Sequence, residues 1–478
     1  MNKYLILLPI ALLGVSACND FLDVQPEHLI SENNFYETAN DFETALIGNY
    51  ATLQDLHNVD ILYLTELTTD NAEIQWTSPT QSEMEFDELN VTPINNLVNA
   101  VWNDCFTTIS RSNNVLTRLE GANIDESIKA QYRGEALFLR AYCYFYMVRL
   151  FGEVPIVEET FRSPGEVAAF DMTRQPVDEV YALITDDLTE AADLLEEVSG
   201  LSKSRASEGA AQTLLGKVHL TRQNYAAAAE VLKEVIDANV YSLQPDYRTL
   251  FTNGNDELPE SIFEIKYLSG NIGEGNAFSS VFTPPRFDMA IFPGNMQGTG
   301  RIVPTADVAQ AYEPGDERRA ASVADSVLLV DGTYAENIYG LKFVDFTTGL
   351  VGDGGINFTA LRYADVLLMY AEALNALGDT EEALIYLDLV RERAGLTPLS
   401  GLSAEETTLA LEQERRVEFL SEGHRWFDLI RTGRAQAVMN AYFASKGLNF
   451  TLENHELVMP VPQEEIDIDP NLEQNLGY

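Results

Sequence analysis

Trp76 lies in a polar stretch of the chain whose side chains could bind a sugar. Residues 65–83 show no apolar periodicity that would bury an indole ring, so we expect a contact surface there. A sugar ring has an apolar face of C–H groups and hydroxyls around its edge, which suits an aromatic plate flanked by carboxylates and amides. The flanking candidates are Asp70, Asn71, Glu73 and Gln75.

Charged residues of both signs alternate at helical spacing nearer the C-terminus. They are Glu414, Arg415, Arg416, Glu418 and Glu422, followed by Arg425 and Asp428. Paired carboxylates could indicate a glycosidase. The interleaved arginines favour instead an internal ion-pair network that joins two helices. Trp426 and Trp102 lie among apolar residues at helical spacing and are predicted to be in the core.

The sequence contains no recognisable catalytic or cofactor motif. Its five histidines are scattered without metal-binding spacing, and there is no GxSxG segment to present a nucleophilic serine. The glycine-rich segments 270–275, 294–300 and 349–355 lack the Lys-Ser/Thr ending of a phosphate loop and are interpreted as surface loops. We therefore predict no cofactor, no metal and no enzymatic activity.

The N-terminus combines Lys3, an apolar run over residues 4–13 and small residues that lead to Cys18. This pattern is typical of a secretory signal, and the run is too short for a membrane span, which takes ~20 apolar residues. It resembles a bacterial lipoprotein signal, which implies cleavage after residue 17 and lipid on Cys18. Residues 18–31 include Pro26 and little apolar periodicity, so we expect a flexible lipidated tether.

The other two cysteines, Cys105 and Cys143, both fall in apolar helical patterns. These patterns favour buried free thiols over a disulfide, which an exported protein could also form.

The chain is strongly acidic, with a formal net charge of −45. Nucleic acid is excluded as a partner, because no cluster of Lys and Arg is present to neutralise phosphates. The acidity also disfavours attraction of the body to an anionic membrane, so the lipid is expected to be the only membrane anchor.

The hydrophobic periodicity predicts a mostly α-helical fold. Helices are expected over 130–151, 177–198, 206–222, 225–238, 361–377, 380–393 and 404–431. The first of these is apolar on nearly every face, which predicts a helix buried in a helical array. Residues 240–360 are rich in Gly, Pro and Asn and indicate an irregular insertion with a few strands, one of them within 261–267. We expect a single domain over 32–478, divided into 32–239, 240–360 and 361–478.

Two of the helix pairs show the spacing of small and large residues that is typical of tetratricopeptide units. One pair contains Gly216 and Ala228, and the other contains Gly378 and Ala383. A small residue at the crossing lets two helices approach closely. Because the two alanines lie 155 residues apart, the units are not tandem, and the insertion separates them.

Seven segments resemble the SusD/RagB family of nutrient-binding lipoproteins of the outer surface of Bacteroidetes. They are residues 18–26, 135–157, 214–232, 361–378, 391–396, 414–433 and 471–478, and they occur in the family's order. The resemblance implies a helical fold on a tetratricopeptide scaffold, a lipid anchor in the outer membrane facing the cell surface, and no catalysis. It also implies a partner, a SusC-like TonB-dependent transporter, on which the protein sits as a lid.

The resemblance further implies glycan contacts in the region of Trp76 and in the mid-chain insertion. The insertion contains no tryptophan and offers Phe278, Phe282, Arg286, Phe287, Phe292 and Asn295. For each of these residues, local packing within the insertion is the alternative interpretation. The second half of an aromatic platform would then be formed by phenylalanine or tyrosine, or the ligand is not a stacked glucan.

Three functional classes are compatible with the sequence. The first is a lid that binds a glycan, with a neutral polysaccharide favoured by the negative charge of the protein. The second is a lid that binds a peptide or another nutrient with the same transporter partner. The third is a tetratricopeptide-type scaffold for protein interaction. The lipoprotein signal and the loop-rich insertion favour the first two.

Overall fold

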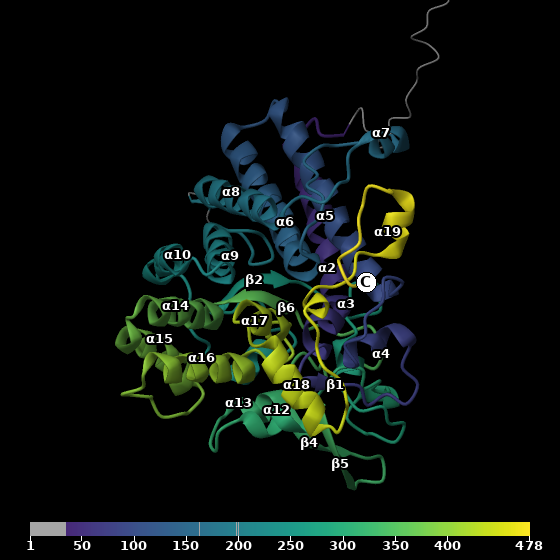
Figure 1. Cartoon of the computed structure of the whole chain (residues 1–478), viewed down its shortest axis with the longest axis vertical. Coiled ribbons are helices and arrows are strands. Elements are labelled where there is room, and N and C mark those ends of the chain that lie inside the picture. Colours follow the sequence, from purple (N-terminus) through teal and green to yellow (C-terminus); the bar gives the residue numbers. More distant parts are fainter. Residues whose placement is uncertain (1–34, 162, 197, 199) are drawn as a thin grey trace, which may run out of the picture.

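The computed structural model describes residues 35–161, 163–196, 198 and 200–478. The predicted signal peptide (1–17) and tether (18–31), including Cys18, lie outside the described residues. The described part is mostly helical, with three two-stranded sheets, as the sequence predicts. Helices α5 (Asn96–Glu120), α6 (Glu126–Phe151) and α8 (Val177–Leu195) lie toward one end of the molecule. The hairpin of β4 (Val323–Leu328) and β5 (Tyr334–Gly340) lies at the other end (Figure 1).

The helices are distributed over the whole described chain, and η marks short 3₁₀ or π turns. They are α1 (Ala39–Tyr50), α2 (Thr52–Asn58), α3 (Asp60–Leu62), η2 (Tyr63–Leu67), α4 (Gln81–Asp87), α5 (Asn96–Glu120), α6 (Glu126–Phe151), α7 (Pro164–Ala169), α8 (Val177–Leu195), α9 (Glu208–Thr221), α10 (Tyr225–Asp237), η3 (Tyr247–Phe251), α11 (Phe278–Val281), η4 (Pro293–Asn295), α12 (Ala306–Ala311), α13 (Arg318–Ser322), α14 (Tyr363–Leu377), α15 (Thr380–Arg393), α16 (Ala404–Glu418), α17 (Arg425–Arg431), α18 (Ala435–Ser445), η5 (His455–Leu457) and α19 (Gln463–Ile468).

Helix α6 is the buried helix that the sequence predicts, and it packs between α5 and α8. Its N-terminus is capped by Asp125, whose side chain accepts a hydrogen bond from the amide of Ser127. Its buried charge is compensated, because Arg140 donates to both carboxylate oxygens of Asp187 on α8 at 2.8 and 2.7 Å. A charged side chain inside a helical array is tolerated when it is paired in this way.

The two tetratricopeptide-like pairs are α9–α10 and α14–α15. Gly216 is needed at the first crossing, because a Cβ atom there would lie 2.5 Å from a methyl carbon of Leu232. Helix α10 packs against α14, so the two pairs are neighbours in space although the insertion separates them in sequence. Figure 1 shows α8, α9, α10, α14, α15 and α16 as one continuous stack.

The strands lie mostly in the insertion, and all three pairs are antiparallel. β2 (Ser261–Ile265) pairs with β6 (Phe358–Arg362), and β4 (Val323–Leu328) pairs with β5 (Tyr334–Gly340). β1 (Ala72–Glu73) pairs with β3 (Val303–Pro304). Strands β2 and β6 therefore bring the two ends of the insertion together. Strand β1 pairs an N-terminal segment with the middle of the insertion.

The prediction of one continuous helix over 404–431 is wrong, because this stretch forms two helices, α16 and α17. The backbone reverses between them, where Ser421 has φ 66° and Gly423 has φ 74°. A Cβ atom at Gly423 would lie 2.8 Å from the hydroxyl of Thr65, so both space and backbone conformation favour glycine there. Glu422 lies in this turn and forms ion pairs with Arg362 at 2.7 Å and with Lys342 at 2.8 Å.

The predicted ion-pair network is confirmed, and Glu418 is at its centre. Its carboxylate is fully buried and accepts from Arg318 and Arg362 at 2.8 and 2.6 Å and also from Arg393. Lys342 donates to the main-chain oxygen of Glu418 at 2.7 Å. The network joins α16 to the insertion and to α15, so it fixes the insertion on the helical stack.

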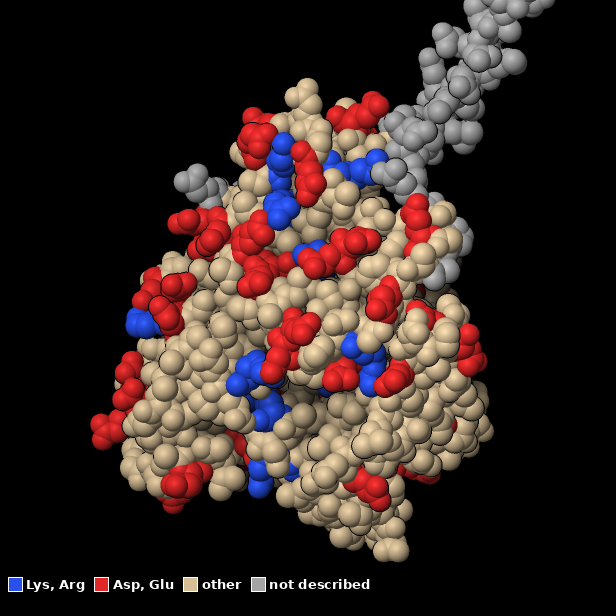
Figure 2. Space-filling model, turned by 45° about the horizontal axis from the view of Figure 1, so that its top comes forward, with Lys and Arg blue, Asp and Glu red and all other residues tan. Residues whose placement is uncertain are grey.

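The expectations for the core residues are confirmed. Trp102 and Trp426 are buried, and Cys105 and Cys143 are buried free thiols. Among the described residues, we find no helix with both the length and the apolar character needed to cross a membrane. Acidic side chains are spread over the face shown in Figure 2, with fewer basic ones among them.

Candidate functional site

The structure joins the Trp76 segment to the insertion through main-chain hydrogen bonds. Beyond the β1–β3 pairing, the amides of Gln75 and Trp76 both donate to the carbonyl oxygen of Gly300, at 2.8 and 3.2 Å. The two regions in which the sequence analysis expected ligand contacts are therefore in direct contact, although they are far apart in sequence.

Gly300 also brings a third segment to this point. It has φ 58°, and a Cβ atom there would lie 2.7 Å from Cδ of Pro285 and 3.3 Å from Cβ of Gln75. The amide of Arg286 donates to the carbonyl of Pro284 at 2.8 Å, which makes the chain turn tightly just before Phe287. Phe287 itself is 82% exposed. We call Glu73, Gln75, Trp76, Arg286, Phe287 and Arg301 the Trp76 surface.

Trp76 is partly exposed, whereas the other two tryptophans of the chain are buried. Its indole N–H donates to the carbonyl oxygen of Ser78 at 2.8 Å, so the polar edge of the ring is satisfied locally and the ring orientation is fixed. No aromatic side chain stacks on Trp76 within the described part of the chain. A held aromatic ring with an accessible surface is suited to stacking against a flat apolar face.

Ion pairs neutralise the charged groups of the Trp76 surface. Arg301 pairs with Glu83 at 2.7 Å, and Glu73 pairs with Lys446 of α18 at 2.5 Å. Arg286 donates to both carboxylate oxygens of Asp288, at 2.9 and 2.8 Å, and this bonding raises the pKa of Arg286 and lowers that of Asp288. The surface therefore presents little net charge to a ligand.

Several polar atoms in this region lack a hydrogen-bond partner among the described residues. They are Oε1 of Gln75, Nε2 of Gln297, Nε of Arg301 and Oδ1 of Asn337. Gln75 uses its amide nitrogen to donate to the carbonyl oxygen of Ile338 on β5 at 3.0 Å. Buried polar atoms normally find a partner in the protein or in ordered water, so ordered water is expected at these atoms.

Asp70 and Asn71 do not belong to the Trp76 surface, because both are buried. Asp70 binds Arg425 through both carboxylate oxygens at 2.9 and 3.0 Å. Burial alone would raise the pKa of its carboxyl, but the hydrogen bonds and charges of Arg425 and Arg416 lower it overall. Asn71 accepts from Arg416 at 2.9 Å. These two residues serve the ion-pair network.

The aromatic candidates of the insertion are also mostly internal. Phe278 and Phe282 are fully buried, and Phe292 is buried and stacks on Phe346 with ring centroids 5.8 Å apart. For these three, local packing is what the structure shows. Asn295 lies in the short turn η4. Phe287 is the one phenylalanine of the set that is exposed.

Lys446, directly after α18, and Asp87 of α4 also contribute to this region, and the sequence does not predict either contribution. Lys446 reaches Glu73 from 373 positions away, and no local pattern marks it. Asp87, at the end of α4, is a half-buried carboxyl whose pKa is raised to about 7 by burial and by the charge of Glu73.

The chain matches known proteins over nearly its whole length. Residues 329–478 match a family described as "SusD family", and residues 20–220 match one described as "Starch-binding associating with outer membrane". The chain is 29% identical to "SusD-like protein P2" of Formosa agariphila over 100% of both chains. It is 24% identical to "Starch-binding protein SusD" of Bacteroides thetaiotaomicron over 97% of this chain and 96% of the other.

A solved structure shares the fold. The structure named "Laminarin binding SusD-like protein" has a TM-score of 0.79 and 27% sequence identity, and the match covers 93% of this chain and 100% of that one.

Proposed function

The chain belongs to the SusD/RagB family, and from this premise we propose that it binds a nutrient glycan through the Trp76 surface and passes it to a transporter. Proteins of this family bind their ligands without catalysis, so the chain is not an enzyme. The observation that carries the proposal is Trp76, a partly exposed ring held by its own N–H bond where the two candidate regions meet. Phe287 is the candidate for a second aromatic contact.

A neutral polysaccharide is the favoured ligand class. The protein carries a formal charge of −45, which repels polyanions. Arg286 and Arg301, the two basic residues that could attract an anionic glycan, are both paired with carboxylates. Two similar proteins have names that state binding of laminarin and of starch.

A binding screen of the mature protein tests the proposed function. Neutral oligosaccharides derived from laminarin and starch, an acidic oligosaccharide and a mixture of peptides would each be titrated by calorimetry. We expect binding in the micromolar to millimolar range, roughly −4 to −8 kcal/mol, because a protein that passes its ligand on must also release it. Binding of peptides alone would favour the alternative of a peptide-binding lid.

We also propose that lipid on Cys18 anchors the protein in the outer membrane. The anchor needs the thiol of Cys18, so Cys18→Ala is expected to abolish both the incorporation of labelled fatty acid and fractionation with outer membranes. Cys105→Ala and Cys143→Ala are the control variants, because both thiols are buried in the folded domain. Membrane fractionation of Cys18→Ala at the wild-type level would contradict the anchor.

The proposed partner is a SusC-like TonB-dependent transporter, over which the protein acts as a lid. A lasting contact of this kind typically buries ~1,600 Å² in total. We therefore expect the protein to co-purify with a large TonB-dependent barrel from gently solubilised outer membranes. Recovery of the protein alone, with or without crosslinking before solubilisation, would count against the lid and favour an independent binding protein.

A further inference from the structure

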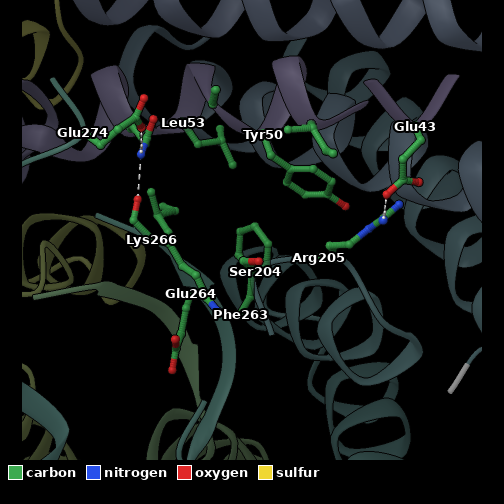
Figure 3. Close-up of a pocket in the computed structure, with 13 residues that line it drawn as sticks. Glu43, Tyr50, Leu53, Ser204, Arg205, Phe263, Glu264, Lys266 and Glu274 are labelled. Carbon is green, nitrogen blue, oxygen red and sulfur yellow. Dashed lines mark hydrogen bonds and ion pairs between the residues drawn. The ribbon is translucent and has the colours of Figure 1, made fainter. Parts of the chain in front are cut away.

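A cavity lies away from the Trp76 surface, between the first helices and strand β2. Its volume is about 420 Å³, and none of the Trp76-surface residues lines it. Helices α1 and α2 form one wall, β2 forms the other, and Ser204, Arg205 and Glu274 close its ends. Figure 3 shows Glu274 and Glu43 at opposite ends, with Tyr50 and Leu53 between them.

Part of the lining of this cavity is apolar. Leu53 and Phe263 are fully buried, Ile265 is nearly so, and all three line the cavity. Ile47 stands at the edge and is 57% exposed. A ligand with an aliphatic or ring-shaped body would lie against these side chains and remove the exposed part of Ile47 from water.

The hydrogen-bond donors around the cavity are already in use. Arg205 donates to both oxygens of Glu135, at 2.8 and 2.7 Å, and also to Glu43. Gln54 donates to the carbonyl oxygen of Lys266 at 2.7 Å and to Glu274 at 3.1 Å. The ammonium of Lys266 pairs with Glu257 at 2.6 Å, outside the set of lining residues.

Acceptors, in contrast, remain available at the Glu274 end. Glu274 is exposed and accepts one hydrogen bond, from Gln54, and no Lys or Arg of the described chain forms an ion pair with it. The amide oxygen of Gln54 receives no hydrogen bond from the described residues. A carboxylate accepts only, so its natural ligand is a donor, and a cationic donor makes the stronger bond.

We propose that this cavity binds an organic ammonium group, with Glu274 as its counter-ion and Gln54 as a second acceptor. The body of the ligand lies along Leu53, Phe263 and Ile47. An amino sugar and the side chain of a lysine-containing peptide both carry this chemistry. The inference does not depend on the Trp76 surface, so either site can fail without the other.

Calorimetric titrations of the mature protein test the proposal with matched probes. The ammonium probes are the fully deacetylated disaccharide of glucosamine and a glycyl-lysine amide whose N-terminus is acetylated. Their neutral counterparts are the N-acetylated disaccharide and the same peptide with its lysine acetylated. We expect saturable binding of at least one ammonium probe, and at least ~10-fold weaker binding of its neutral counterpart, because hydrogen bonds to charged groups are the strong ones. The probe that binds identifies the source of the ammonium group.

Two variants locate the binding. Glu274→Gln keeps the size of the side chain and removes its charge, so we expect affinity for the ammonium probe to fall about 10-fold or more. Glu230→Gln, at an exposed carboxylate of α10 that does not line the cavity, is the control for the general negative charge. This control should bind the ammonium probe as the wild type does.

Three results would overturn the proposal. The first is the absence of saturable binding of both ammonium probes. The second is equal affinity for an ammonium probe and its acetylated counterpart. The third is an unchanged affinity of Glu274→Gln, since binding would then lie elsewhere on the acidic surface.

Discussion

Glu418→Ala is expected to lower the free energy of unfolding by about 3–5 kcal/mol, because it leaves buried arginines without their shared counter-ion. Glu418 is fully buried and contacts Arg318, Arg362 and Arg393. Each arginine keeps another carboxylate partner, such as Glu414 or Glu260, but each loses the buried hydrogen bond that it donates to Glu418. Chemical denaturation followed by circular dichroism measures the change.

The matched control is a carboxylate whose ion pair is exposed. Lys233 and Asp237 pair at 2.5 Å on α10, with side chains 50% and 62% exposed. Pairs of this kind contribute less than about 1 kcal/mol, so Asp237→Ala should unfold close to the wild type. Equal effects of Glu418→Ala and Asp237→Ala would contradict the structural role assigned to the network.

The same network predicts loss of stability in acid. Burial opposes the charged form of Glu418, Asp365 and Asp428, but neighbouring cations hold their pKa values below the ordinary values. These cations are arginines for Glu418 and Asp428, and Lys217 followed by Arg415 for Asp365. Stability from these groups is complete above the ordinary values of 4.5 and 3.8 and is lost as the pH falls below them. Burial raises the pKa of Glu414, which acts in the opposite sense.

Trp76→Ala is expected to weaken glycan binding at least ~30-fold, because aromatic anchors commonly contribute about 2 kcal/mol or more. The melting temperature should change little, since Trp76 is only partly buried and no aromatic ring stacks on it in the described part of the chain. Calorimetry with the ligand found in the screen gives the affinity, and a thermal scan gives the stability.

Two control variants separate binding from folding. Trp102→Ala removes a buried ring, so it should cost about 3–5 kcal/mol of stability. Phe287→Ala removes the exposed ring of the insertion and should reduce affinity without lowering stability. Normal affinity of Trp76→Ala, or a large fall in its melting temperature, would show that the indole ring belongs to the core and not to the binding surface.

Local sequence patterns predict the helical scaffold, because the formation of a helix depends on residues that are close in sequence. The all-round apolar character of α6 and the small residue at Gly216 each reflect a contact that the structure contains. The break between α16 and α17 was missed, because Gly423 was read as part of one long helix. The approach of Thr65 favours glycine at position 423, and no local pattern reveals that approach.

The candidate site was predicted less well than the fold. Asp70 and Asn71 look like flanking groups of a polar loop, but Arg425 and Arg416 bury them from more than 340 positions away. Phe282 and Phe292 look like platform residues in a loop-rich insertion, but the insertion has its own core. Trp76 and Phe287 remain candidates for ligand contact, because no distant element covers them completely.

Intrinsic fluorescence reports directly on ligand contact with Trp76, because Trp102 and Trp426 are buried and only Trp76 is partly exposed. Laminarin- and starch-derived oligosaccharides would be titrated into the wild type, Trp76→Phe and the buried-site control Trp102→Phe. We expect a saturable change in emission for the wild type and Trp102→Phe, and its loss in Trp76→Phe. An undiminished change in Trp76→Phe, or no response of the wild type to any neutral oligosaccharide, would contradict this expectation.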